Sequence, residues 1–425
     1  MSERWSRDQV LGLAPDPASG RAAGTVAKPA KWGGTGCDDL AVWGECQGSG
    51  SSAYRVCVDL SEPAFRCSCP SRKFPCKHAL GLLLLWSDGA ASAAEQPAWV
   101  AEWLEQRQHR TEQKARQPVA KTTDPKTAQR REQRVDDGID ELDRWLRDQV
   151  TQGLSQTEQA PYSLWDEAAR RLVDAQAGAL AGQVRALATI PRRGPDWPER
   201  LLEEYGLLRL LVRAHQRRDE LPEALRETVR ARVGFTLSHD EVLREAPVRD
   251  HWYVAGVRDS EQEQLITRRI WLRGGATGRS ALVLSFGAPG RALDASLVPG
   301  TTLDADLAFY PGAQPLRAIV ATRHGAPAQE RPPGVTVTVF LAEYAQALRR
   351  DPWLDRWPAV FADVRLSRDR HLIDPNGDAL PLESADLWGL LALSGGEPIT
   401  VAGEWTPRGL LPLSAWHERD GVITL

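Results

Sequence analysis

The stretch RCSCPSRKFPCKH, residues 66–78, contains four side chains of the kinds that bind transition metals, Cys67, Cys69, Cys76 and His78. They follow the spacing Cys-x-Cys-x6-Cys-x-His. A structural zinc ion takes four such ligands in a tetrahedron, through thiolate sulfur at ~2.3 Å and imidazole nitrogen at ~2.0–2.1 Å. Because four protein ligands leave no open position for a reactive water, the stretch predicts one structural zinc ion rather than a catalytic one.

The segments on either side of this motif predict two strands and a helix. Residues 54–60 alternate between apolar and other side chains, which is typical of a strand, and a second short strand is expected over residues 64–69. Residues 77–86 are mostly leucine with helical spacing. Two cysteines separated by one residue on a strand face the same side, and the following loop returns the chain to the start of the helix. The alternative is that the thiols pack as small apolar groups beside a surface histidine.

The chain from Trp43 to Trp86 resembles the SWIM zinc finger, a ββα module, as it occurs in bacterial SWIM zinc finger family proteins of about this length. The resemblance rests on these segments: GECQGSG at 44–50, YRVCVDL at 54–60, CSCPSRKFPCKH at 67–78 and LGLLLLW at 80–86. It implies zinc bound by the three cysteines and the histidine, and a role in DNA or protein interaction. Bacterial members are often encoded beside MoxR-type AAA+ ATPases and von Willebrand A-domain proteins, which the resemblance implies as partners.

Five residues around the motif are candidate contacts with nucleic acid or a protein partner: Arg66, Arg72, Lys73, Phe74 and Lys77. Three thiolates and one Zn²⁺ leave a net charge of −1, so one role of the bases is to offset that charge, and phosphate contact is the other. Phe74 either stacks on a base or packs against its own module. Residues 107–134 form the basic tract of the chain, which is interpreted either as a solvated linker or as an electrostatic arm.

The whole sequence predicts an α+β multidomain protein. Proline, glycine and alanine before residue 36 indicate an extended arm, helical spacing dominates from Val135, and a period of two dominates from about Pro247. The expected divisions are an extended arm over 1–40, a SWIM-type zinc finger over 41–98, a polar basic linker over 99–134, a helical region over 135–246 and a β-rich mixed C-terminal region over 247–425.

The composition is that of a globular protein, with 42% hydrophobic and 26% charged residues. The longest strongly apolar run, Ala79–Trp86, is far shorter than the ~20 residues that a membrane span needs. The charged start of the chain contains no apolar signal core, which predicts a cytoplasmic protein without a membrane partner. Six cysteines are too sparse for a disulfide scaffold, and the net charge of −4 argues against indiscriminate nucleic-acid binding.

Motifs of catalysis are missing from the sequence, including the phosphate-binding loop, HExxH and GxSxG patterns. We therefore predict that the protein is not an enzyme and has no small-molecule substrate, unless the β-rich region holds a pocket. Cys37, Cys46 and Cys57 are interpreted as ordinary thiols. The favoured function is an adaptor that binds protein partners, and the alternative is a DNA- or RNA-binding regulator that uses the finger and residues 107–134.

Overall fold

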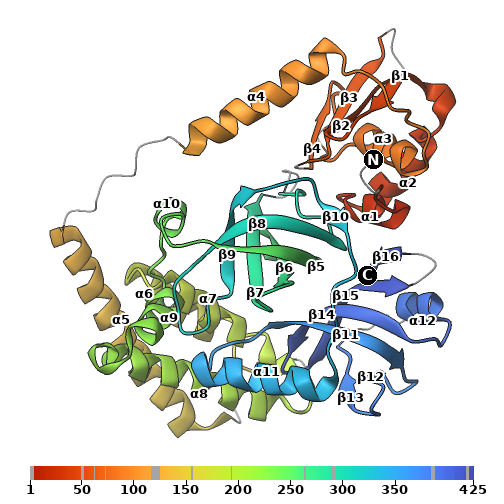
Figure 1. The fold of residues 1–425 in the computed structure, drawn as a ribbon. Coiled ribbons are helices and arrows are strands. Elements are labelled where there is room, and N and C mark those ends of the chain that lie inside the picture. The colour runs from red at the N-terminus through yellow and green to blue at the C-terminus, as the bar shows by residue number, and fades with distance from the viewer. Residues whose placement is uncertain are drawn as a thin grey trace.

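The computed structural model describes residues 4–48, 52–61, 63–71, 73–115, 125–154, 157–192, 194–262, 265–288, 293–383, 388–417 and 421–425. Helices and sheets are mixed along the chain. Figure 1 shows a finger unit in red and orange at the top, a barrel in green and cyan at the centre, a helical region at the lower left and a second sheet in blue at the lower right. Within the described residues, no helix is both long and apolar enough to cross a bilayer.

The finger unit is built on a four-stranded antiparallel sheet in the order β1-β2-β3-β4. Its strands are β1 (Trp32–Cys37), β2 (Ala41–Cys46), β3 (Tyr54–Asp59) and β4 (Ala64–Cys67). Its helices are α1 (Arg7–Gly12), α2 (Pro17–Val26), α3 (Lys77–Ser87) and α4 (Ala98–Ala115), with a 3-10 turn at Pro29–Lys31. Leu80, Leu83 and Leu84 of α3 are buried against Val56 and Val58 on one face of the sheet. The finger is therefore larger than the two strands and one helix that the motif predicts.

The expectation of an extended arm over residues 1–40 is wrong, because this segment folds onto the finger as two helices and a strand. Asp16 accepts a hydrogen bond from the backbone N–H of Ser19 and so caps α2, and Pro17 occupies its first turn. Proline at the start of a helix is favourable, since its missing N–H has no helical acceptor there. Alanine is also the best helix former. The proline- and alanine-rich composition from which we expected an extended arm is also typical of a capped, alanine-rich helix.

Close packing of α2 on α3 depends on Gly81. A Cβ atom at this position would lie 2.6 Å from Cγ2 of Val26, whereas a Cβ at Gly24 meets nothing within 4 Å. We expect Gly81→Val to destabilise the finger by about 1–3 kcal/mol, the usual cost of overpacking a core. Denaturant-dependent hydrogen exchange of α2 and α3 measures this change. Gly24→Val is the control, and an equal loss in both variants would show that the effect is one of helix propensity rather than packing.

The expectation of a linker over residues 99–134 also needs correction. The start of helix α4 packs on the second face of the finger sheet, where Val100 lies with Trp43 and Cys57. Helix α5 (Pro125–Gln152) then begins inside the expected linker. The apolar residues at the start of α4 recur at helical spacing and are too few to stand out in so polar a segment. Residues 116–124, the centre of the expected linker, lie outside the described residues.

The helical region continues from α5 through a bundle with its own core. Its further helices are α6 (Ser163–Asp174), α7 (Gly178–Leu187), α8 (Trp197–Gln216) and α9 (Glu223–Val233), with 3-10 turns at Ile190–Arg192 and Arg218–Glu220. Trp145, Trp165 and Tyr205 meet at ring-centroid distances of 5.8–6.2 Å in the core. A short helix, α10 (His239–Val242), follows the bundle and is capped by Ser238, as the Ser-x-x-Glu spacing predicts.

The next unit is a closed barrel of five strands. They are β5 (Val248–Gln262), β6 (Leu265–Gly274), β7 (Ser280–Gly287), β8 (Thr301–Phe309) and β9 (Arg317–Arg323), with a short β10 (Ala328–Gln329) beside β8. β5 pairs with both β6 and β8, β6 with β7, and β8 with β9, all antiparallel. A short parallel pairing between β7 and β9 closes the ring. Trp252, Ile270 and Leu303 fill the interior.

The last unit is a second barrel that repeats this connectivity. After helix α11 (Val337–Arg350), its elements are β11 (Trp357–Leu366), β12 (His371–Ile373), β13 (Ala379–Pro381), α12 (Trp388–Ser394), β14 (Ile399–Thr406), β15 (Gly409–His417) and β16 (Gly421–Thr424). β11 pairs with β12 and β14, β12 with β13, and β14 with β15. A parallel bridge from Leu382 to Leu410 joins the end of β13 to β15. Val335, just before α11, forms a single parallel bridge with Phe361.

Candidate metal centre

The four predicted ligands come together at one end of the finger sheet. Cys67 is the last residue of β4, Cys76 is the N-cap residue of α3, and His78 lies in the first turn of α3. Cys69 lies in the loop between these elements. One ligand atom from each of the four residues lies within 4.8 Å of the others. The strand end and the helix start therefore hold Cys67, Cys76 and His78 in place as the sequence predicts, whereas the strand expected over residues 64–69 ends at Cys67 and does not include Cys69.

The dimensions of the cluster fit a tetrahedral zinc ion. At a Zn–S distance of ~2.3 Å, the sulfur atoms of a tetrahedral site lie about 3.8 Å apart. Sγ of Cys67 and Nδ1 of His78 are 3.9 Å apart, so Nδ1 is the imidazole atom that faces the sulfurs. The ring of Tyr54 lies against the His78 ring at a centroid distance of 5.0 Å and fixes its orientation. Tyr54 is a supporting residue that the motif alone does not reveal, although the strand alternation places it beside the site.

The thiols of the cluster ionise unequally. A hydrogen bond from the Cys67 thiol, with others from His78 and from the backbone N–H of Ala79, lowers the pKa of Cys76 to about 4. The hydrogen bond to Cys76 and burial raise the pKa of Cys67, and burial raises the pKa of Cys69. The Cys76 thiolate is thus stabilised by hydrogen bonds from its neighbours. Zinc would take the place of these protons, because it binds cysteine as thiolate and displaces the thiol protons.

The five candidate contact residues differ in what they offer a partner. Arg66 and Lys77 are exposed, while Nζ of Lys73 forms an ion pair with Asp16 at 2.8 Å. The hydrogen bond from Lys73, together with the backbone N–H of Ser19, lowers the pKa of Asp16 to about 2. Phe74 packs edge-to-face on Phe65 at 5.6 Å and is still 41% exposed. Arg72 lies outside the described residues.

The remaining cysteines are not members of the four-ligand cluster. Cys37, Cys46 and Cys57 are buried in the finger, and burial raises the pKa of each thiol. Among the residues that the structure describes, the cluster of Cys67, Cys69, Cys76 and His78 is the group of potential ligands close enough to share one ion.

A strand end, a loop and a helix start that converge on a Cys3His set define a zinc finger. Family models match this chain in two places, the SWIM zinc finger over residues 56–86 and the SWIM-associated four-helix bundle domain over residues 130–233. The chain is a SWIM-type zinc finger protein, and its finger holds one structural zinc ion. No curated protein and no solved structure matches the chain. The second match covers α5 to α9, for which the sequence predicts a helical region without naming its kind.

Proposed function

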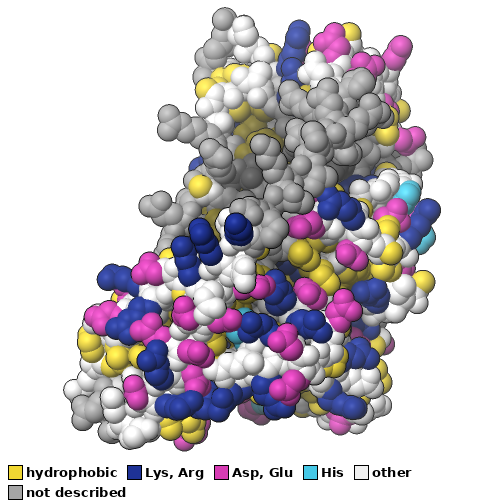
Figure 2. All heavy atoms as spheres, turned by 90° about the vertical axis from the view of Figure 1, so that its left-hand side faces the viewer, with side chains coloured by type: hydrophobic (Ala, Val, Ile, Leu, Met, Phe, Trp, Pro, Cys, Tyr) yellow, Lys and Arg dark blue, Asp and Glu magenta, His cyan; other side chains and the backbone are white. Residues whose placement is uncertain are grey.

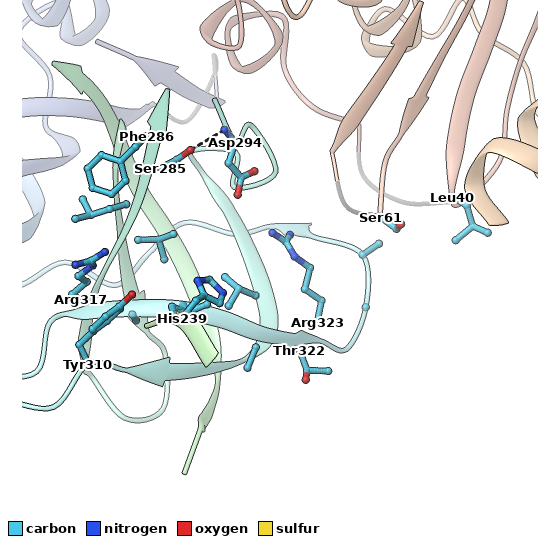
Figure 3. Close-up of a pocket in the computed structure, with 18 residues that line it drawn as sticks. Leu40, Ser61, His239, Ser285, Phe286, Asp294, Tyr310, Arg317, Thr322 and Arg323 are labelled. Atoms are coloured by element: carbon cyan, nitrogen blue, oxygen red, sulfur yellow. Dashed lines mark hydrogen bonds between the residues drawn. The ribbon is translucent and has the colours of Figure 1, made fainter. Parts of the chain in front are cut away.

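We propose that the protein is an adaptor whose zinc loop, residues 68–75, binds protein partners. Leu40 and Ser61, at the opposite end of the finger strands from the ligands, face the first barrel (Figure 3). Strands of six residues separate the two ends by about 20 Å. The zinc loop therefore points away from the body of the molecule, where a partner can reach it. A closed four-ligand site supports a binding role and leaves no position for metal catalysis.

The observation that carries this proposal is the exposed ring of Phe74 in the zinc loop. Its neighbour Lys73 is already paired with Asp16. An exposed aromatic side chain with a rigid backing is typical of the anchor residues in protein interfaces. Zinc fixes the loop that presents the ring, so binding is expected to depend on the metal. The partners that the family resemblance suggests are a MoxR-type AAA+ ATPase and von Willebrand A-domain proteins.

The alternative is nucleic-acid binding through the finger and residues 107–134. Arg107 is paired with Asp59 at 3.2 Å, and Arg131 donates to the carbonyl of Gly234 and lies over Phe235. On the face drawn in Figure 2, basic and acidic side chains are interspersed over the helical region. Phosphate groups bind best to unpaired cations on a surface where positive charges are not mixed with negative ones. Arg107 and Arg131 are thus engaged within the chain, and this supports a protein partner rather than phosphate for the finger.

Affinity capture with the full, zinc-loaded chain tests the adaptor proposal. Wild type, Phe74→Ala and Tyr162→Ala are each used to capture proteins from nuclease-treated native lysate, with crosslinking to the bait. Tyr162 is the matched control because it is an exposed aromatic residue, 54% accessible, in the helical region. We expect proteins that crosslink to residues 68–75 to be reduced about tenfold by Phe74→Ala alone, at unchanged zinc content. An identical set of crosslinked proteins in all three samples would contradict the proposal.

A further inference from the structure

A cavity with a mainly polar lining lies between the first barrel and helix α11. Its volume is about 400 Å³, which is within the ~300–1,000 Å³ range of ligand sites. The lining comes from residues 277–280 at the β6–β7 hairpin, residues 313–315 between β8 and β9, and α11 from Glu343 to Arg350. Trp357, the first residue of β11, completes it. No residue of the finger lines this cavity, so the site is separate from the zinc loop.

Arg279 brings a positive charge to this cavity that the protein leaves uncompensated. Its guanidinium lies over the ring of Phe309 at 4.1 Å, and no side chain among the described residues pairs with it or accepts from it. The side chain is half-buried, and burial lowers the pKa of Arg279, whereas the ion pair with Asp304 raises the pKa of Arg249 on the same barrel. The ring covers one face of the guanidinium and leaves the N–H groups in its plane free to bind an anion.

Arg350 supplies a second cation from the last turn of α11. It is exposed, and its Nη1 donates to Oε1 of Gln314 at 3.2 Å, which is a neutral partner. No ion pair of Arg350 occurs within the described part of the chain. Arg349 lies in the same turn but outside the lining, where its charge balances the negative end of the helix dipole. The charge of Arg350 is therefore available to the cavity.

The acid in the lining is already neutralised. Both carboxylate oxygens of Glu343 accept hydrogen bonds from Arg273, at 2.5 and 2.9 Å. Asp250, near the β6–β7 hairpin, is outside the lining, and its carboxylate accepts backbone N–H groups of that hairpin. Because the pair of Glu343 with Arg273 is neutral, Arg279 and Arg350 give the cavity two uncompensated positive charges.

The lining also contains a buried donor without a partner. Trp357 is 3% exposed, and its Nε1–H has no acceptor among the described residues. Buried donors are normally paired, since an unmade hydrogen bond is costly. An anion with several oxygens offers acceptors to this lining and charge to its two guanidinium groups. A carboxylate carries one negative charge, whereas a phosphate monoester carries about −1.5 to −2 at pH 7 on three terminal oxygens. Arginine also binds phosphate through two parallel N–H groups, so the phosphate fits this lining better.

We infer that this cavity binds a phosphate dianion between Arg279 and Arg350, either as free phosphate or as the terminal phosphate of a small organic ester. The ligand contacts the first barrel and α11, the helix that leads into the second barrel. It is therefore expected to strengthen the contact between the two barrels. The inference does not depend on the adaptor role of the finger.

Isothermal titration calorimetry of the zinc-loaded full chain tests this inference. The titrants are inorganic phosphate, phenyl phosphate and phenyl sulfate, in phosphate-free buffer at constant ionic strength. Phenyl sulfate has the shape of phenyl phosphate with a single charge, so we expect it to bind about tenfold more weakly. Equal affinity for the two phosphates would assign free phosphate as the ligand, and tighter binding of phenyl phosphate would assign an ester.

Variants identify the cavity as the site. We expect Arg279→Ala and Arg350→Ala each to weaken phenyl phosphate binding about tenfold, through the loss of a charge-assisted hydrogen bond. Arg349→Ala is the matched control, because it removes the same charge from the same turn of α11 outside the lining, and less than a twofold change is expected. Arg350 is exposed, so at least this variant keeps the fold intact.

Hydrogen exchange with and without phenyl phosphate locates the bound anion independently. We expect slower exchange over residues 275–279 and in the last turns of α11, and no change in the finger. Absence of binding at millimolar concentration, equal binding of phenyl sulfate, or equal weakening by Arg349→Ala would overturn the inference.

Discussion

Replacement of Cys76 by serine is expected to reduce the bound zinc from one ion per chain to nearly none. A hydroxyl is a poor substitute for the thiolate that zinc requires, and Cys76 is also the residue that starts α3. Structural zinc contributes about 10–16 kcal/mol of apparent binding free energy in isolated zinc-finger peptides. Here the four-stranded sheet and the α2–α3 contact keep a core without the metal. We therefore expect hydrogen exchange to increase most over residues 64–80, and less in β1 and β2.

The matched control for this prediction is Cys57→Ser, which changes another buried thiol of the same sheet that lies outside the cluster. Metal content by mass spectrometry and hydrogen exchange of the full chain are measured for both variants. Cys57→Ser is expected to keep one zinc ion, with a moderate loss of stability because a polar group replaces a buried sulfur. One zinc ion retained by Cys76→Ser would rule out the assigned ligand set. Equal zinc loss in both variants would show that the metal is lost through general unfolding.

The zinc site could be predicted from the sequence because its determinants are local. Cys67 and Cys76 lie at the end of a strand and the start of a helix, and both boundaries follow from alternation and apolar spacing within about 30 residues. The prediction for residues 1–40 was wrong because the fold of this segment depends on a contact with a distant part of the chain. In α2, Asp16-Pro17 is both a turn signal and a helix start, and the contact of Val26 with α3 decides between them. That contact joins residues 55 positions apart in the chain.

The two barrels could not be predicted because closure depends on distant pairings. Val248 pairs with Leu307, and Leu282 with Arg317, and neither pair leaves a local pattern beyond the alternation that every strand shares. The duplication is also invisible in the sequence. The connectivity of a barrel determines which positions face inward, but it does not determine which residues occupy those positions. Two barrels can therefore have the same strand order and dissimilar sequences.

The contact between the two barrels leads to the last prediction, which concerns Glu404. Its side chain is fully buried on β14 of the second barrel, where it accepts hydrogen bonds from Trp271 and Arg269 of the first barrel and pairs with Arg356. We expect Glu404→Gln to destabilise the contact by about 3–5 kcal/mol, since removing one partner from a buried ion pair leaves the other charges uncompensated. Hydrogen exchange of β6 and β14 against denaturant concentration measures this change.

Glu397→Gln is the control for this prediction. Glu397 is 75% exposed and its ion pair with Arg365 is long, 3.9 Å, so we expect a loss below about 1 kcal/mol.

The pH dependence of the Glu404 effect follows from the direction of its pKa shift. Burial alone would raise this pKa, but the charges of Arg356 and Arg269 outweigh burial and hold the pKa below its ordinary value. A carboxyl whose pKa is depressed in the folded state stabilises the fold above its unfolded pKa, and this contribution is lost as the pH falls through the folded pKa. The difference between wild type and Glu404→Gln should therefore be full at neutral pH and shrink below about pH 4. A difference that stays constant down to pH 3 would mean that the glutamine variant is destabilised by its shape and hydrogen bonding rather than by its missing charge.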